Sequence, residues 1–285
     1  DACGIVSYSY IDTQSGSCPL IVTRTYTVTD LCGHSTNCTQ TFTISDTQAP
    51  FINTCPPSAS YEGCDLTYIT GLPYSAVSTT ITAVQWTNAG GVASDACGIN
   101  TYSYSDTQSG TCPITITRTF VLTDGCLHST SCVQSITIND TQNPQITSCP
   151  PSQTIEGCSL AAITGLPYSA TPVTITSADF TGEGGAATDN CGIVSYRYVD
   201  TQSGSCPIVV TRTYTITDVC SHTATCSRTF TINDTQNPQI TTCPPARNIE
   251  GCNLSAITGL IYSPVSVSIS LAQFTAAGGV ATDVC

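Results

Sequence analysis

Apolar and polar residues alternate along several stretches of the chain. From residue 114 to residue 123, isoleucine, phenylalanine and leucine occupy even positions, whereas threonine fills most odd positions. A period of two is typical of an antiparallel β-strand with one buried face. A second alternating run covers residues 132–138, after a turn-rich segment at 124–131, so the pair predicts a β-hairpin. Residues 177–181, which precede a Gly-rich stretch, predict a single helical turn.

The whole pattern returns at a fixed interval. The string Asp-Ala-Cys at residue 1 has counterparts at residues 95, 189 and 283, so the period is 94 residues, which is the size of a domain. An Asp-Thr-Gln-x-Pro string at residues 46, 140 and 234 ends each alternating run and marks a domain boundary. We therefore expect complete domains and two partial ones in a segment of a longer protein. The complete domains are 47–140 and 141–234; residues 1–46 are the C-terminal part of a repeat and 235–285 the N-terminal part of another.

Strand count and composition predict the fold class. About seven short strands per period suit an immunoglobulin-like sandwich, so we expect an all-β array of tandem immunoglobulin-like domains. Charged residues make up 9% of the chain and its net charge is −13, which argues against nucleic acid and anionic membrane surfaces as partners. No apolar run reaches the ~18 residues of a membrane span, so we expect no membrane insertion in this segment.

The cysteines predict the compartment. The chain has 19 of them, six in each period, and the closest two, Cys32 and Cys38, lie farther apart than the zinc-ligand spacing of two to four residues. Such a density without metal-type spacing is typical of disulfide-bonded extracellular proteins. We expect a secreted or cell-surface localisation and disulfide-bonded domains.

One arginine per period falls on the apolar face of its predicted strand. Arg118 shares the parity of Phe120, and Arg212 is its counterpart one period later. A buried cation needs a partner, and the recurring acid of the Glu-Gly-Cys turn is the candidate. We expect structural ion pairs of Arg118 and Arg212 with Glu62 and Glu156.

The recurring aspartates suggest a cation site at the domain boundaries. Asp46, Asp140 and Asp234 lie at the three boundaries, and further aspartates recur in two sets, at residues 1, 95 and 189 and at residues 30, 124 and 218. Hard oxygen ligands gathered at a junction favour Ca²⁺. No contiguous Asp-x-Asp-x-Asp loop is present, and Asx-turns explain single aspartates equally well. Two alternatives follow. Either the chain binds no cofactor, or it binds Ca²⁺ through Asp46, Asp140 and Asp234.

Several motifs resemble a known family. Residues 93–98 (Ala-Ser-Asp-Ala-Cys-Gly), residues 109–113 (Ser-Gly-Thr-Cys-Pro), the stretch 117–126 and Cys132 look like the hyalin repeat, and more narrowly its Cys-rich version in large surface adhesins of Bacteroidetes, including those of gliding motility. The family's usual Gly-Asn is replaced by residue pairs such as Leu127-His128. The resemblance implies an immunoglobulin-like fold, a secreted surface protein and an adhesive role, and no catalysis.

Six cysteines per domain must be paired. In an immunoglobulin-like sandwich Cys64 and Cys112 follow turns at one end, and Cys55, Cys97, Cys126 and Cys132 lie at the other, so we expect Cys64–Cys112. For the other four the hyalin resemblance implies Cys55–Cys132, which leaves Cys97–Cys126; the alternative is Cys126–Cys132 with Cys55–Cys97. The same scheme gives Cys149–Cys226, Cys158–Cys206, Cys191–Cys220 and Cys3–Cys32.

Two functions fit these expectations. In the first, the array is a disulfide-stiffened stalk or filament shaft whose partners are neighbouring repeats and further copies. In the second, each repeat binds surface glycans or proteins weakly, with Ca²⁺ as an aid, and repetition provides avidity. A hydrolase needs one pocket with a positioned triad, whereas Asp, His and Ser or Thr recur here on a short loop in every repeat. We therefore do not expect an enzyme.

Overall fold

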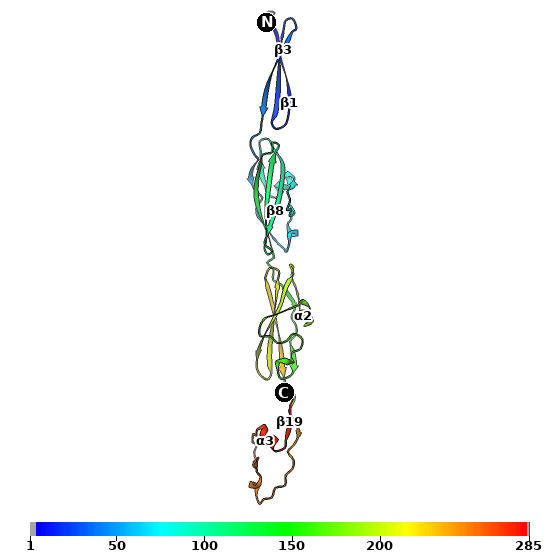
Figure 1. The fold of residues 1–285 in the computed structure, drawn as a ribbon, viewed down its shortest axis with the longest axis vertical. Helices are drawn as coiled ribbons and strands as arrows, with labels where there is room; N and C mark the ends of the chain where they lie inside the picture. Colours follow the sequence, from blue (N-terminus) through cyan, green and yellow to red (C-terminus); the bar gives the residue numbers. More distant parts are fainter. Residues whose placement is uncertain (1–3, 284) are drawn as a thin grey trace. The chain divides into compact units, whose positions relative to one another are not determined.

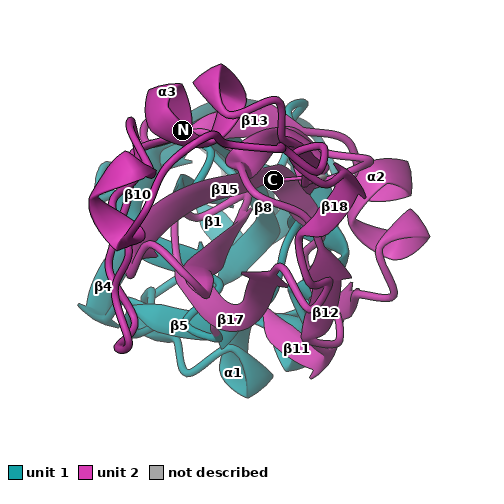
Figure 2. Ribbon diagram, turned by 90° about the horizontal axis from the view of Figure 1, so that it is seen from below, with its two compact units in different colours: residues 1–142 teal, residues 143–285 magenta. Residues whose placement is uncertain are grey.

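The computed structural model describes residues 4–283 and residue 285. The chain forms two compact units, residues 1–142 and residues 143–285 (Figure 2). In both units β-strands make up most of the regular secondary structure and the helices are short, which confirms the predicted all-β class (Figure 1). Among the described residues, no helix has the length and apolar character that crossing a membrane requires.

Three long antiparallel strands open the first unit. The sheet has the order β1-β2-β3 (blue in Figure 1). β1 and β2 face each other in a nearly continuous register, in which Tyr10 lies opposite Tyr26. Its strands are β1 (Ile5–Ser15), β2 (Leu20–Asp30) and β3 (Ser35–Ile44).

The remainder of the first unit is a two-layered sandwich. One layer is a five-stranded sheet of order β5-β10-β9-β8-β6, in which β5 runs parallel to β10 and the other neighbours are antiparallel; the second layer is the pair β4-β7. Its seven strands match the predicted number. The elements are β4 (Phe51–Thr54), β5 (Ala59–Glu62), the 3-10 turn η1 (Leu66–Tyr68), β6 (Thr79–Ile81), α1 (Ala83–Asn88), β7 (Val92–Ser94), β8 (Ile99–Ser109), β9 (Ile114–Asp124) and β10 (Ser129–Asn139).

The second unit begins with the same arrangement one period later. Its five-stranded sheet has the order β12-β17-β16-β15-β13 and its two-stranded sheet is β11-β14. The elements are β11 (Gln145–Ser148), β12 (Gln153–Glu156), η2 (Leu160–Ala162), β13 (Val173–Ile175), α2 (Ser177–Gly182), β14 (Ala186–Thr188), β15 (Ile193–Ser203), β16 (Ile208–Asp218) and β17 (Thr223–Asn233), followed by β18 (Gln239–Thr242), η3 (Leu254–Ala256), α3 (Leu271–Ala276) and β19 (Val280–Thr282).

The core of each sandwich lies between its two sheets. In the first unit, Phe120 and Leu122 of β9 are fully buried and pack with Trp86 of α1. Ile52 of β4 and Ala93 of β7 cover this cluster from the second sheet. The alternating apolar positions on which the strand prediction rests are therefore the ones that fill the core.

The predicted helical turn is present as α2, and its start and end have clear causes. Thr176 accepts a hydrogen bond from the backbone of Asp179, and the Asp179 carboxylate accepts one from the backbone of Thr176, so the two form a capping box. Phe180 is fully buried beneath the helix. Its ring occupies the space that a Cβ on Gly185 would need, which is why a glycine follows the helix.

Candidate functional site at the repeat junction

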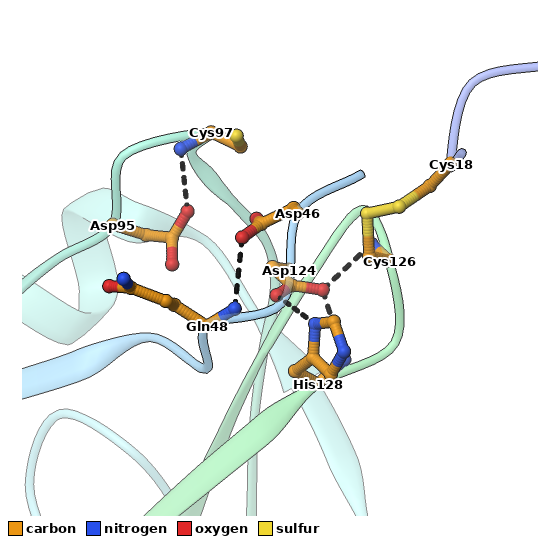
Figure 3. Close-up of a disulfide and its surroundings, with 8 residues drawn as sticks. All are labelled: Cys18, Asp46, Gln48, Asp95, Cys97, Asp124, Cys126 and His128. Carbon is orange, nitrogen blue, oxygen red and sulfur yellow. Dashed lines mark hydrogen bonds and ion pairs between the residues drawn. A yellow bond between two sulfur atoms is a disulfide. The ribbon is translucent and has the colours of Figure 1, made fainter. Parts of the chain in front are cut away.

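One disulfide bond crosses a predicted domain boundary. Cys18, in the turn between β1 and β2, is bonded to Cys126, in the turn between β9 and β10 (Figure 3). The two Cα atoms are 5.3 Å apart although 108 residues separate them in the sequence. Because residue 18 precedes the boundary string at residue 46 and residue 126 follows it, the bond joins two successive repeats covalently.

A second bond of this kind lies in the other unit. Cys158, just after β12, is bonded to Cys285, which follows β19, across a sequence separation of 127 residues and a Cα–Cα distance of 5.4 Å. It crosses the boundary string at residue 234. Both observed boundary bonds thus use cysteines located at the ends of the sandwich.

Two other bonds lie within single repeats. The structure joins Cys55 to Cys132 and Cys149 to Cys226, each with a Cα–Cα distance of 6.0 Å. These are two of the expected pairs. They connect the segment after β4 to β10, and the segment after β11 to β17. The strands that follow these segments, β5 and β12, run parallel to β10 and β17.

Two predicted pairs are wrong. Cys97–Cys126 is excluded because Cys126 is bonded to Cys18, and Cys158–Cys206 is excluded because Cys158 is bonded to Cys285. The prediction allowed only bonds between cysteines of the same domain. In the structure, Cys126 and Cys158 lie near the end of a sandwich and are bonded to cysteines of the neighbouring repeat. Cys64–Cys112 and Cys191–Cys220 stay predictions; all four residues are disulfide-bonded. Cys3–Cys32 involves Cys3, which lies outside the described residues.

Three carboxylates gather beside the first boundary bond. Asp46, Asp95 and Asp124, one from each recurring set of aspartates, each offer an oxygen, and these oxygens lie within 4.8 Å of one another (Figure 3). Oδ2 of Asp46 is buried and accepts no hydrogen bond from a nitrogen or oxygen donor of the described residues. A cluster of this kind, with one carboxylate oxygen unused, suits a hard divalent cation.

Local hydrogen bonds fix the positions of these carboxylates. Asp46 Oδ1 accepts from the backbone N–H of Gln48 at 3.0 Å, and Asp95 Oδ1 accepts from that of Cys97 at 2.8 Å. These are Asx-turns, the alternative reading of the aspartates. The other two predicted ligands, Asp140 and Asp234, accept in the same way from Gln142 and Gln236.

Asp124 is the most buried member of the cluster, and His128 holds it. Its Oδ1 accepts from the backbone N–H groups of Cys126 and His128 at 2.7 and 3.0 Å, and its Oδ2 lies 3.0 Å from His128 Nδ1. Burial by itself would raise the pKa of Asp124, but the hydrogen bonds from His128 and Cys126 outweigh it and lower the pKa below its ordinary value of 3.8. The recurring histidine therefore stabilises a turn.

The thiol of Cys97 borders the same cluster. Its pKa is raised because it donates a hydrogen bond to the Asp46 carboxylate and because the thiolate would face the negative charges of Asp46, Asp95 and Asp124. Cys97 therefore stays protonated, and in this form it is a poor nucleophile.

The two arginines are buried, as predicted, but their predicted partners are wrong. Arg118 is 3% exposed and donates from Nε and Nη2 to both oxygens of Asp106, at 2.8 and 2.9 Å. Asp106 on β8 lies directly opposite Arg118 on β9 in the sheet register. Arg212 pairs with Asp200 in the same way. The partner is therefore not an acid in a turn but the aspartate across the hairpin, twelve residues earlier.

The two glutamates close a different contact. Both oxygens of Glu62 accept hydrogen bonds from Thr141, one from its backbone N–H at 2.8 Å and one from its hydroxyl at 2.9 Å. Glu156 accepts the equivalent pair from Thr235. These hydrogen bonds lower the pKa of Glu156. The glutamates thus attach the boundary string to the end of β5 or β12.

Comparisons with known proteins identify no close relative. No family model matches the chain, and no curated protein sequence matches it. Among solved structures, the human desmocollin-1 ectodomain shares 11% identity over 79% of this chain and 50% of its own, with a TM-score of 0.23. A protocadherin γB7 EC3–6 cis-dimer structure shares 13% identity over 78% of this chain and 68% of its own, with a TM-score of 0.27. This chain thus spans about half the length of the desmocollin ectodomain. At these scores, the fold assignment rests on the chain's own sheets.

Proposed function

We propose that this chain is a structural segment of a long extracellular adhesin or filament, in which disulfide bonds between successive repeats stiffen a stalk. The Cys18–Cys126 bond carries the proposal, because it spans a boundary that the backbone crosses only through a short linker. A second covalent connection across a linker restricts hinge motion between the joined domains. The hyalin-like motifs support an adhesin of the bacterial surface as the parent protein, and the disulfide density supports an oxidising, extracellular setting.

A comparison of equivalent pockets favours the stalk over a ligand-binding module. In the first unit a hollow of about 480 Å³ is lined by residues that include Ala89 and Gln134. One period later, Glu183 and Arg228 occupy these positions and form an ion pair with each other. A glycan site shared by all repeats would need the same lining in each copy, whereas here these two lining positions change from neutral to charged residues.

The stiffening is tested by removing the boundary bond. We expect the Cys18→Ser/Cys126→Ser variant to sample more arrangements of residues 4–46 relative to residues 47–140, because only the linker then joins them. Small-angle scattering and pulsed distance measurements between two labels, one in each segment, report this as a broader distribution.

The matched control is Cys55→Ser/Cys132→Ser, which removes a bond inside one repeat. It should lower the melting temperature and leave the distance distribution unchanged. A boundary variant as narrow in its distribution as the parent chain would refute the stalk proposal.

A calcium-dependent form of the same role is the second candidate. The carboxylate cluster of Asp46, Asp95 and Asp124 favours it, with the unused Oδ2 of Asp46 as the specific observation. Calorimetric titration with Ca²⁺ at low ionic strength tests it. Binding that is lost in Asp46→Asn and kept in Asp65→Asn, an exposed Asx-turn residue outside the cluster, would support the site. No heat of binding by the parent chain would exclude it.

A further inference from the structure

The hollow in the first complete repeat has the size of a small-ligand site. Its volume is about 480 Å³, and such sites usually measure about 300–1,000 Å³. Its lining comes from β5 and the segment before it, from the loop before β6, from α1, and from β9 and β10. All of these lie within residues 57–136, so the hollow belongs to a single repeat.

The buried arginine of this repeat lines the hollow and has one nitrogen without a partner. Nε and Nη2 of Arg118 donate to Asp106, and Nη2 also donates to a proline carbonyl oxygen. Its Nη1 donates no hydrogen bond to any residue that the structure describes. One period later, Nη1 of Arg212 donates to the carbonyl oxygen of Leu166 at 2.9 Å. The free Nη1 therefore distinguishes Arg118 from its counterpart and is available as a donor to a ligand.

Two glutamine amides add an acceptor and a second donor to the lining. Gln134 is 8% exposed, and its Nε2 donates to the carbonyl oxygen of Pro57 at 2.6 Å, which leaves its Oε1 as an acceptor. Gln85 of α1 is held the other way round: its Oε1 accepts from Thr82 in a capping box, which leaves its Nε2 as a donor. Within the described part of the chain, neither Gln134 Oε1 nor Gln85 Nε2 has a further partner. Local hydrogen bonds thus fix both amides before any ligand arrives.

The rest of the lining is largely apolar, and the hollow carries no net charge. Leu72 and Ile136 are buried, and Tyr61 packs against the cluster that contains Ile136. Among the described residues no aspartate or glutamate lines the hollow, and the charge of Arg118 is balanced by Asp106. Apolar side chains suit the C–H face of a sugar ring, and amides suit its hydroxyl groups, which both donate and accept. The chain's net charge of −13 disfavours an anionic ligand.

The second complete repeat lacks these groups and fills the same place with an ion pair. Glu183 and Arg228 pair with each other there. Glu183 lies so close to Gly165, the counterpart of Gly71 in the lining, that a Cβ on Gly165 would be 2.7 Å from its Oε1. The equivalents of Tyr61, Gln85 and Gln134 are Ile155, Asp179 and Arg228. The ring and both amides are therefore features of the first complete repeat and not of the common architecture.

We propose that the hollow within residues 57–136 binds one neutral sugar residue of a glycan. Arg118 and Gln134 lie directly opposite each other in the register of β9 and β10, so one hydroxyl group can accept from Arg118 Nη1 and donate to Gln134 Oε1. Nε2 of Gln85 donates to a second hydroxyl group, and the C–H face of the sugar packs on Tyr61. The site gives one repeat of a structural array a ligand of its own, and it does not depend on the stalk.

Saturation-transfer NMR on the full chain tests the binding. The neutral probes are glucose, galactose and N-acetylglucosamine, and the charged probes of similar size are glucuronic acid and glucosamine. We expect at least one neutral sugar to bind with a dissociation constant on the order of 1 mM, and the charged sugars to bind more weakly. Absence of saturation transfer to all three neutral sugars, or a preference for a charged one, would overturn the proposal.

A double variant closes the hollow with the side chains of the second repeat. Ala89→Glu/Gln134→Arg introduces the pair that Glu183 and Arg228 form in an intact sandwich, so we expect the variant to fold. It should weaken the binding of the neutral sugar at least about tenfold, because the ion pair occupies the space and the acceptor of Gln134 is gone. Thermal melts and circular dichroism check that the sandwich is kept.

Two further variants separate the site from general effects. Ala76→Glu/Ser135→Arg adds the same two charges at exposed positions of the same repeat that do not line the hollow, and it should leave the dissociation constant unchanged. Gln85→Glu keeps the acceptor that caps α1 but removes the Nε2 donor. It should weaken the neutral sugar severalfold and leave the melting temperature unchanged.

The variants also define the results that contradict the site. Equal affinity of the parent chain and Ala89→Glu/Gln134→Arg would show that the sugar binds elsewhere and would overturn the proposal. Loss of binding in Ala76→Glu/Ser135→Arg, or unchanged binding in Gln85→Glu, would also count against it. The stalk is judged by the distance distribution of the variant without the Cys18–Cys126 bond, so the two proposals can fail independently.

Discussion

At the residue scale, the same group of side chains is built twice in the core of the sandwiches. Arg212 is fully buried, pairs with Asp200 through two hydrogen bonds, and lies over the ring of Tyr198 with its guanidinium carbon 4.1 Å from the ring centroid. It also donates to the carbonyl oxygens of Leu166 and Pro167. The arginine therefore connects the loop before β13 to the centre of the sheet, and its charge is balanced by that of Asp200.

Removal of one partner should be costly because it leaves the other charge buried. We expect Arg212→Met to reduce the free energy of unfolding of its repeat by about 3–5 kcal/mol, since Asp200 then faces the core unpaired. Arg197→Met removes a charge from the neighbouring strand β15, where Arg197 is exposed, and should change it by no more than about 0.5 kcal/mol. Urea denaturation of the two variants measures the difference; equal losses would contradict the assignment.

Asp124 should make the first unit sensitive to acid. Its pKa is lower in the folded chain than its ordinary value of 3.8, so it stabilises the fold fully above that value. This contribution is lost as the pH falls through the lower folded pKa. We expect the melting temperature to drop below about pH 4, and to drop less steeply in Asp124→Asn, in which this position no longer titrates. Parallel slopes in melts from pH 5 to pH 2 would show that Asp124 is not responsible.

At the element scale, the long strands could be predicted from sequence and the short ones could not. β9 and β16 each show five periods of alternation, so parity identified both the buried face and the buried arginine. β6 and β7 have three residues each, which is too short for a period-two pattern to show. The ion-pair partner of the arginine was not predicted, because its position depends on the register of β8 against β9. The spacing of residues along the sequence does not give this register.

The capping box of α2 should show reciprocal coupling. Thr176→Ala should cost about 1 kcal/mol, as is usual for the loss of an N-cap. Asp179→Ala should cost less when Thr176 is already absent, because each residue bonds the backbone of the other. Thr181→Ala, on the same helix but outside the box, should add to Thr176→Ala independently. Thermal melts of the single and double variants test this, and strict additivity of the box pair would refute it.

At the scale of the whole molecule, the repeat period was predictable from sequence, whereas the covalent connections between repeats were not. The period fixes which cysteines are equivalent, but an equivalent partner can belong to the same repeat or to its neighbour. Cys132 takes the first course and Cys126, six residues earlier, takes the second. The two cysteines differ because Cys126 lies in the β9–β10 turn at the end of the sandwich, next to the preceding repeat. A prediction made for one domain alone does not include that repeat.

Peptide mapping of the native chain provides the direct check. Digestion without reduction should release the peptide that carries Cys18 bound to the one that carries Cys126, and the Cys158 peptide bound to that of Cys285. Reduction should release all four separately. Recovery of Cys97 bound to Cys126 would instead restore the pairing within one domain.

The Cys18–Cys126 bond also determines how the segment would respond to tension. A pull along the backbone normally extends every residue of an unfolded domain, but this bond carries the load from residue 18 directly to residue 126. The segment between the two cysteines, which are 108 positions apart in the sequence, is then excluded from extension, which withholds on the order of 360–390 Å of contour length. Single-molecule stretching should therefore detect the added contour length of this segment only after a reductant is added. A stalk with this bond would therefore lengthen little under load until a reductant breaks the disulfide.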